Sequence, residues 1–141
     1  MFSPKLSNRI AAAIFPGLAL CGCATSGDAD LRSDASKLYE FDVPRPLMDV
    51  YASEIDMLIT CKVGPISTMF DLRIDPTLDR DKHTASIALI ATGYFSPQTW
   101  GVIDMEPRGT STHVRIFGAR KPALANLGRD VERWANAAKG C

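Results

Sequence analysis

The stretch "KPALANLGRDVERWANAAKGC", residues 121–141, repeats apolar side chains at intervals of three and four residues. This spacing places them along one face of an α-helix, which needs an apolar surface to cover. Pro122 stands where a helix can begin, and Gly140 where one can end. Roughly 17 residues at 1.5 Å each reach about 25 Å, enough to cross a whole sheet. The predicted buried face consists of Leu124, Leu127, Val131, Trp134, Ala135 and Ala138.

Four segments upstream of this helix have the patterns of β-strands. Residues 66–75 alternate apolar and polar side chains, which is typical of a strand with one buried face. Residues 83–92 are apolar on both faces in the middle, as in a central strand. Residues 99–106 and 111–118 follow as two further strands. Because only short polar turns separate the four, we expect an antiparallel meander.

One more strand and one more helix precede the meander. Residues 38–43 alternate apolar and acidic side chains and predict a half-buried strand that ends at Pro44. Pro46 is suited to the first turn of a helix that continues to Cys61. Its apolar stripe comprises Leu47, Val50, Tyr51, Ile55, Leu58 and Cys61.

The predicted order is therefore strand, helix, four strands, helix (β-α-β-β-β-β-α). We expect an α+β fold in which an antiparallel sheet of about five strands packs on two helices as a two-layer sandwich. This order resembles the helix-grip arrangement, where a bent antiparallel sheet wraps a long C-terminal helix. Such domains occur in lipoproteins that assist outer-membrane barrel assembly and, in larger form, in carriers of hydrophobic ligands. The resemblance implies a fold and not a function.

The first thirty residues have the pattern of a secretion signal. Lys5 and Arg9 form a basic region, and residues 10–20 form an apolar run of eleven residues. That run is well short of the roughly 20 residues that a membrane-spanning helix needs. We therefore expect a cleaved signal, with an uncleaved anchor as the alternative.

The end of the apolar run, "LCGC" at residues 20–23, resembles the lipobox of bacterial lipoproteins. The resemblance implies a signal peptide over residues 1–22 and a Cys23 that carries diacylglyceryl and acyl groups, palmitate among them. Several fatty chains give stable membrane attachment. Residue 24 is Ala and not Asp, which by resemblance implies the outer membrane, with the protein facing the periplasm. A plain secretion cut after Ala24 remains an alternative.

The mature chain then divides into a tether and a domain. Residues 23–36 are small and acidic without a visible period, and we expect them to form a flexible tether. Residues 37–141 would form the periplasmic α+β domain.

The cysteines favour cleavage before Cys23 over cleavage before Cys21. Cleavage before Cys23 leaves Cys61 and Cys141 as an even pair, whereas the other site leaves three cysteines in an oxidising compartment. A cut after Ala24 leaves the same even pair. We expect a disulfide between Cys61 and Cys141. A redox thiol or metal ligand is the alternative, disfavoured because the sequence has no Cys-x-x-Cys.

The ionisable residues predict no catalytic or metal site. His83 lies in a predicted turn and His113 on a strand, and we expect both to be solvated. Ser111 stands two residues from His113 without a nucleophile motif. The three aspartates 75, 79 and 81 lack the Gly and Glu of a calcium loop and predict a solvated turn.

Function is constrained mainly by what the sequence lacks. Lys and Arg number 16, as do Asp and Glu, which gives no basic surface for nucleic acid. Phosphate-binding, dinucleotide and zinc-protease motifs do not occur, so we expect neither an enzyme nor a cofactor.

Three aromatic residues, Tyr94, Phe95 and Trp100, cluster around one turn. We expect them to cap the end of the core, with binding of a partner as the alternative. The sequence therefore predicts an accessory or scaffold lipoprotein that is held by the membrane and binds another envelope component. The alternative is a carrier of a small apolar ligand between the sheet and the last helix.

Overall fold

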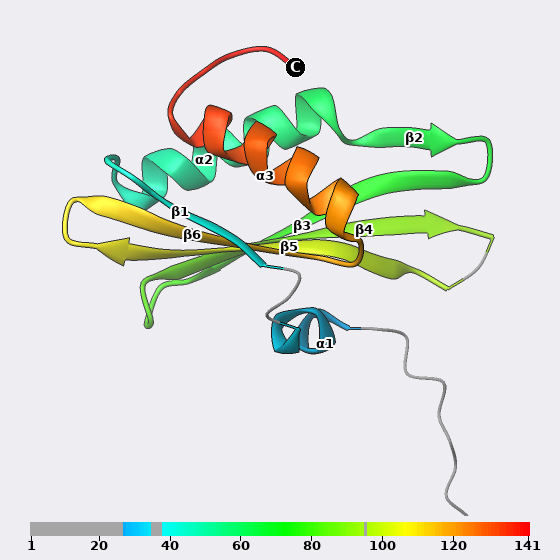
Figure 1. Ribbon diagram of the computed structural model, residues 1–141, viewed down its shortest axis with the longest axis horizontal. Helices are drawn as coiled ribbons and strands as arrows, with labels where there is room; N and C mark the ends of the chain where they lie inside the picture. Colours follow the sequence, from blue (N-terminus) through cyan, green and yellow to red (C-terminus); the bar gives the residue numbers. More distant parts are fainter. Residues whose placement is uncertain (1–26, 35–37, 95) are drawn as a thin grey trace, which may run out of the picture.

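A six-stranded antiparallel sheet forms the body of the protein (Figure 1). The computed structural model describes residues 27–34, 38–94 and 96–141. The helices are Asp28–Ser33 (α1), Leu47–Cys61 (α2) and Lys121–Ala135 (α3). The strands are Leu38–Val43 (β1), Gly64–Ser67 (β2), Phe70–Asp79 (β3), Thr84–Gly93 (β4), Gln98–Arg108 (β5) and Ser111–Gly118 (β6).

The strand order β1-β6-β5-β4-β3-β2 consists of a meander from β2 to β6, with β1 added beside β6. Each neighbouring pair is antiparallel. The helices α2 and α3 lie together on one side of the sheet, which we call the helix face (Figure 1). The α+β sandwich and the meander predicted from the sequence are confirmed.

The strand count differs because the predicted strand 66–75 is two strands. The chain turns back at residues 68–69, where the Met69 amide donates to the Ser67 hydroxyl. An alternating pattern continues through so short a turn, so the sequence did not reveal it. The second strand, β3, also extends to Asp79 through the predicted turn at 75–82. Its Pro76 is tolerated because β2 pairs only with residues 70–72, which leaves one side of β3 unpaired there.

The helix face holds the main core. Trp134 of α3 is fully buried there, together with Leu58 of α2. Gly128 allows α3 to approach β1 closely, since a Cβ at this position would lie 2.6 Å from Cγ of Tyr39. Residues from the sheet complete the core: Val43, Leu72, Ile87, Leu89, Ile103, Met105, Val114 and Ile116.

The opposite side of the sheet, which we call the α1 face, carries the short helix α1 (Figure 1). Leu31 is buried there against Val102 and Phe117. The prediction of a flexible tether over 23–36 is therefore wrong for the six residues of α1. So short a helix is held by tertiary contacts and not by helix propensity, which is why its composition did not indicate it.

Within the described ranges, no helix combines the length and the apolar character that crossing a bilayer requires.

Candidate functional site

A disulfide joins Cys61, the last residue of α2, to Cys141, with the two Cα atoms 5.4 Å apart. The predicted pair is confirmed. Two side chains of α3 also hold the C-terminal segment: Trp134 Nε1 donates to the carbonyl of Gly140, and Arg133 donates to that of Cys141. Cys23, the predicted lipidation site, lies outside the described residues.

A hollow of about 480 Å³ lies on the helix face between the end of α2, the strand β2 and the beginning of α3. A second hollow of about 560 Å³ continues past Trp100 and shares Ala119, Arg120 and Ala123 with the first. We call the two together the apolar groove. Its apolar lining includes Val63, Ile66, Leu72, Leu89, Trp100 and Leu127.

Of the three aromatic residues predicted around one turn, Trp100 lines the groove. Trp100 lines both hollows and is 46% exposed, and Tyr94 is 87% exposed. The expectation that Tyr94 caps the core is therefore wrong. It directly follows β4, at the end of the hairpin formed by β4 and β5. Phe95 lies outside the described residues.

Further exposed apolar side chains gather at the same end of the sheet. The turn between β2 and β3 lies against the end of β4, because Phe70 pairs with Gly93, and a Cβ on Gly93 would collide with the Met69 carbonyl. Met69 is half exposed in this turn, and Ile66 precedes it on β2. The described structure therefore has one end rich in exposed apolar residues.

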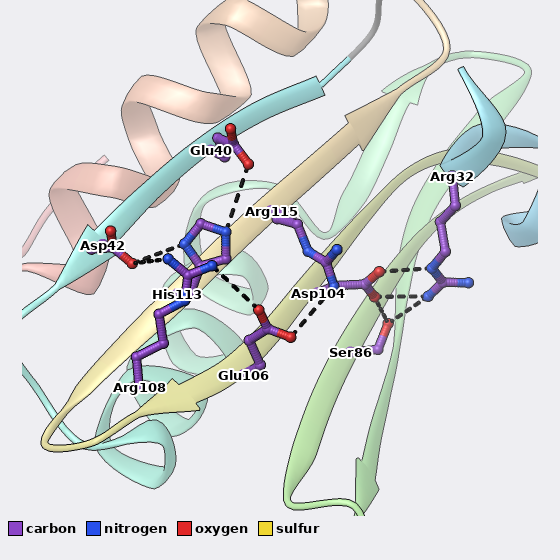
Figure 2. A network of polar contacts seen from close by, with 9 residues as sticks. All are labelled: Arg32, Glu40, Asp42, Ser86, Asp104, Glu106, Arg108, His113 and Arg115. Atoms are coloured by element: carbon purple, nitrogen blue, oxygen red, sulfur yellow. Dashed lines mark hydrogen bonds and ion pairs between the residues drawn. The ribbon is translucent and has the colours of Figure 1, made fainter. Parts of the chain in front are cut away.

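The α1 face carries a group of polar side chains that we call the charged network (Figure 2). At one side of it, Arg32 of α1 donates from two nitrogens to Asp104 of β5, each at 2.7 Å. These bonds raise the pKa of Arg32 above its ordinary value. The Ser86 hydroxyl donates to the same carboxylate at 2.8 Å. The members are Arg32, Glu40, Asp42, Ser86, Asp104, Glu106, Arg108, His113 and Arg115.

His113 lies at the β1 side of the charged network, beside Asp42 and Glu40, and is only 7% exposed (Figure 2). Its Nδ1 lies 2.8 Å from Oδ1 of Asp42, and since a carboxylate only accepts, Nδ1 carries the proton. Its Nε2 lies 3.6 Å from Oε2 of Glu40. The prediction that His113 is solvated is therefore wrong, because strand pairing places β1 carboxylates over the imidazole. Ser111 donates to the carbonyl of Arg108 and not to His113.

The helix face holds one ionisable side chain that sequence reasoning missed. Glu54 is fully buried, and neither carboxylate oxygen has a hydrogen-bond partner in the described structure. Burial raises its pKa from 4.5 to about 8, against a smaller opposing effect of Arg45. Its position, four residues after Val50 and four before Leu58, could have shown that it lies on the buried stripe of α2.

The remaining candidates lie in turns and on an exposed strand. His83 is exposed in the turn after β3, as predicted. Asp79 accepts hydrogen bonds from the amides of Lys82 and Asp81, which lower its pKa, while Asp75 lies within β3. Among the residues that the structure describes, no group of three or more His, Cys, Asp or Glu side chains could hold a metal ion.

A scan against protein-family models finds no family that matches the chain, and a search of the curated proteins finds no match to its sequence.

Proposed function

We propose that the chain is a lipoprotein of the outer membrane, acylated at Cys23, whose domain acts as a non-catalytic accessory. The apolar groove beside Trp100 would bind another envelope component. The observation that carries this proposal is an apolar hollow, open to solvent, that runs past a half-exposed tryptophan.

The chemistry of the groove suits an apolar segment of a protein partner. Tryptophan and arginine are enriched among the residues that contribute most to protein interfaces. Trp100 and Arg120 both line the groove, and exposed Val63 and Ile66 border it. Burial of these side chains against a partner would contribute roughly 25 cal/mol for each Å² of apolar area.

The charged network favours a structural over a catalytic role. Each of its carboxylates contacts an Arg or His side chain: Asp104 bonds Arg32, Glu106 lies near Arg108 and Arg115, and Asp42 and Glu40 flank His113. These contacts join α1 and β1 to the central strands. Only Nε of Arg115 is buried without a hydrogen-bond partner among these side chains, so the ion pairs support docking of the two elements more than proton transfer.

A carrier of a small apolar ligand is the second candidate. The hollow of about 480 Å³ between the sheet and α3 falls in the size range of small-molecule sites. Leu72 and Leu89 of the sheet and Leu127 of α3 would contact such a ligand. The two candidates differ in what occupies the same groove.

A photoreactive amino acid at Ala123 tests the groove in intact cells. We expect an adduct with one protein, which is lost when Trp100→Glu is added and retained with Met48→Glu. Met48 is 53% exposed at the start of α2, outside both hollows, and serves as the matched control. An adduct with a small apolar molecule would support the carrier instead. An adduct that survives Trp100→Glu would contradict both candidates.

The anchor has its own test, the intact mass of protein from the membrane fraction after alkylation of free thiols. We expect the mass of the chain from Cys23 plus lipid, and no lipid in Cys23→Ser. An unlipidated mass for the unmodified protein would contradict the anchor and leave the groove to be judged by the photochemical result.

A further inference from the structure

The chain enters the described domain beside its apolar end. At the first residue of α1, Asp28 accepts a hydrogen bond from the Thr99 hydroxyl at 3.0 Å. Thr99 directly precedes Trp100 near the beginning of β5. The start of α1 therefore lies at the same end of the sheet as the apolar groove, because Thr99 and Trp100 both line the second hollow.

This entry point is fixed on the sheet by α1 itself. Leu31 is 6% exposed, and the two bonds from Arg32 to Asp104 hold the next residue of the helix. Planar guanidinium–carboxylate pairs of this kind impose geometry as well as attraction. The direction from which the chain reaches the domain is therefore set by side chains of β5.

The anchor of the proposed function would lie close to this point. Cys23 precedes Gly27 by only four residues, and four steps of 3.8 Å span at most about 15 Å. The lipid on Cys23 would sit in the bilayer, so Gly27, which precedes the contact of Asp28 with Thr99 at the apolar end, would lie within that distance of the headgroups. The step rests on the acylation of Cys23.

The surface brought to the membrane has the composition of an interfacial one. Tyr94 and Trp100 are aromatic residues with a polar atom, which favour the boundary between water and lipid. Ile66 on β2 and Met69 in the turn before β3 add exposed apolar area at the same end. Arg120 and Lys121 are exposed at the adjacent start of α3 and suit anionic headgroups.

We propose that this end of the domain, formed by Ile66, Met69, Tyr94 and Trp100, rests on the lipid surface. The exposed turns enter the headgroup region, and α1 sets the orientation. The apolar groove then opens directly above the membrane, where it can receive the membrane-proximal part of a partner.

The two tryptophans allow the contact to be measured on the full lipidated protein. Trp100 is 46% exposed, whereas Trp134 is fully buried and serves as the internal reference. We would reconstitute the protein in phosphatidylethanolamine and phosphatidylglycerol vesicles that contain lipid brominated on the acyl carbons nearest the headgroup. Bromine quenches only nearby indoles, so we expect loss of most Trp100 emission and little change in Trp100→Phe, which retains Trp134 alone.

A pair of matched double variants distinguishes this contact from proximity alone. Met69→Ser with Tyr94→Ser should reduce the quenching of Trp100, whereas Met48→Ser with Ile59→Ser should not. Met48 and Ile59 are exposed to a similar extent as Met69 but belong to α2. Equal quenching in both double variants would overturn the proposal.

If something other than lipid covers the apolar end, the fluorescence of Trp100 should respond differently. If iodide still quenches Trp100 in vesicles and brominated lipid does not, the membrane contact is overturned. If Trp100 is protected from iodide only at high protein density, and brominated lipid does not quench it, a second copy of the chain covers it. This result also overturns the membrane contact. The intact mass of the same sample separates the two proposals. A lipidated mass without quenching of Trp100 refutes the membrane contact alone. Quenching of Trp100 in a protein of unlipidated mass supports the contact and refutes the anchor.

Discussion

The two faces of the sheet treat ionisable side chains in opposite ways. On the helix face, Glu54 is buried among apolar residues without a hydrogen bond, and its pKa is raised to about 8. On the α1 face, buried His113 and partly buried Asp104 have charged or polar partners within 2.8 Å. Burial without a partner favours the neutral form of a carboxyl, whereas hydrogen-bond partners offset the cost of burying a polar side chain. Both arrangements thus occur on opposite faces of the same sheet.

This difference predicts different consequences of mutation. The helix face contains the main core and the disulfide, so changes there alter the free energy of unfolding of the whole domain. The α1 face contains a small cluster around Leu31, and changes there act on the docking of one short helix.

The disulfide should have the largest effect. Cys61 and Cys141 are 80 residues apart, and removal of a bond that closes so long a loop costs about 4 kcal/mol in the chain-entropy account. We expect Cys61→Ala with Cys141→Ala to lower the free energy of urea-induced unfolding by that amount. Reduction of the unmodified protein should give the same loss, and a stability insensitive to reductant would contradict the helix-face assignment.

Glu54 should make the domain less stable as pH rises. Below about pH 4.5 the carboxyl is neutral in the folded and unfolded states; between 4.5 and about 8 only the unfolded state ionises, so stability falls. Glu54→Met should remove this slope and raise the free energy of unfolding by up to about 5 kcal/mol at pH 9, because the pKa rises from 4.5 to about 8 and each pKa unit corresponds to about 1.4 kcal/mol. The measurement is urea unfolding at pH 5 and pH 9.

The control for this variant is Asp56→Asn, which changes an exposed carboxyl on the same helix. It should leave the pH dependence unchanged. A Glu54→Met protein that keeps the full slope would show that another group is responsible.

Leu31→Ala should release α1 without unfolding the domain. The side chain is 6% exposed in a small cluster, so we expect a loss of about 1–2 kcal/mol, below the usual cost in a main core. Hydrogen exchange should become faster in α1 and remain slow in α3. Equal acceleration in both helices would mean that the two faces unfold together.

Arg32→Lys should have the smallest effect. Lysine keeps the charge but cannot form two parallel bonds to Asp104, and a partly exposed pair contributes less than about 1 kcal/mol. We expect slightly faster exchange in α1 and a stronger dependence on salt. Arg108→Lys, whose ion pairs are longer at 3.6 Å, provides the comparison and should have no measurable effect on α1.

The fold could be predicted from the sequence wherever the apolar period was unbroken. The buried positions of α3, from Leu124 to Trp134, follow directly from spacing, and Cys61 lies at the end of the α2 stripe. The turn at residues 68–69 could not be predicted, because a tight turn leaves an alternating pattern intact. The end of β3 was not predicted because its acidic residues, including Asp75 and Asp79, indicated a solvated turn, whereas the structure continues the strand there and tolerates Pro76 on its unpaired side.

The candidate site was only partly predictable. The sequence pattern predicted that Trp100 and Tyr94 lie around one turn. It could not predict their exposure or the groove, which depend on where α3 begins relative to β2. The burial of His113 depends on β1 joining β6, a pairing between residues about seventy positions apart. The burial of Glu54 was not predicted because a charged side chain suggests an exposed position, although its helical spacing indicates the buried face of α2.

The attachment of α1 also determines how the domain would bear mechanical load. A pull on the chain ahead of Gly27 reaches Asp28, Leu31 and Arg32 in turn, and through Asp28 and Arg32 it reaches Thr99 and Asp104 on β5, which has strands on both sides. Without that link, the force would fall on β1, an edge strand, and would peel it from β6 one residue pair at a time from Leu38 onward. A six-residue helix thus shifts tension from an edge strand to a strand that is paired on both sides.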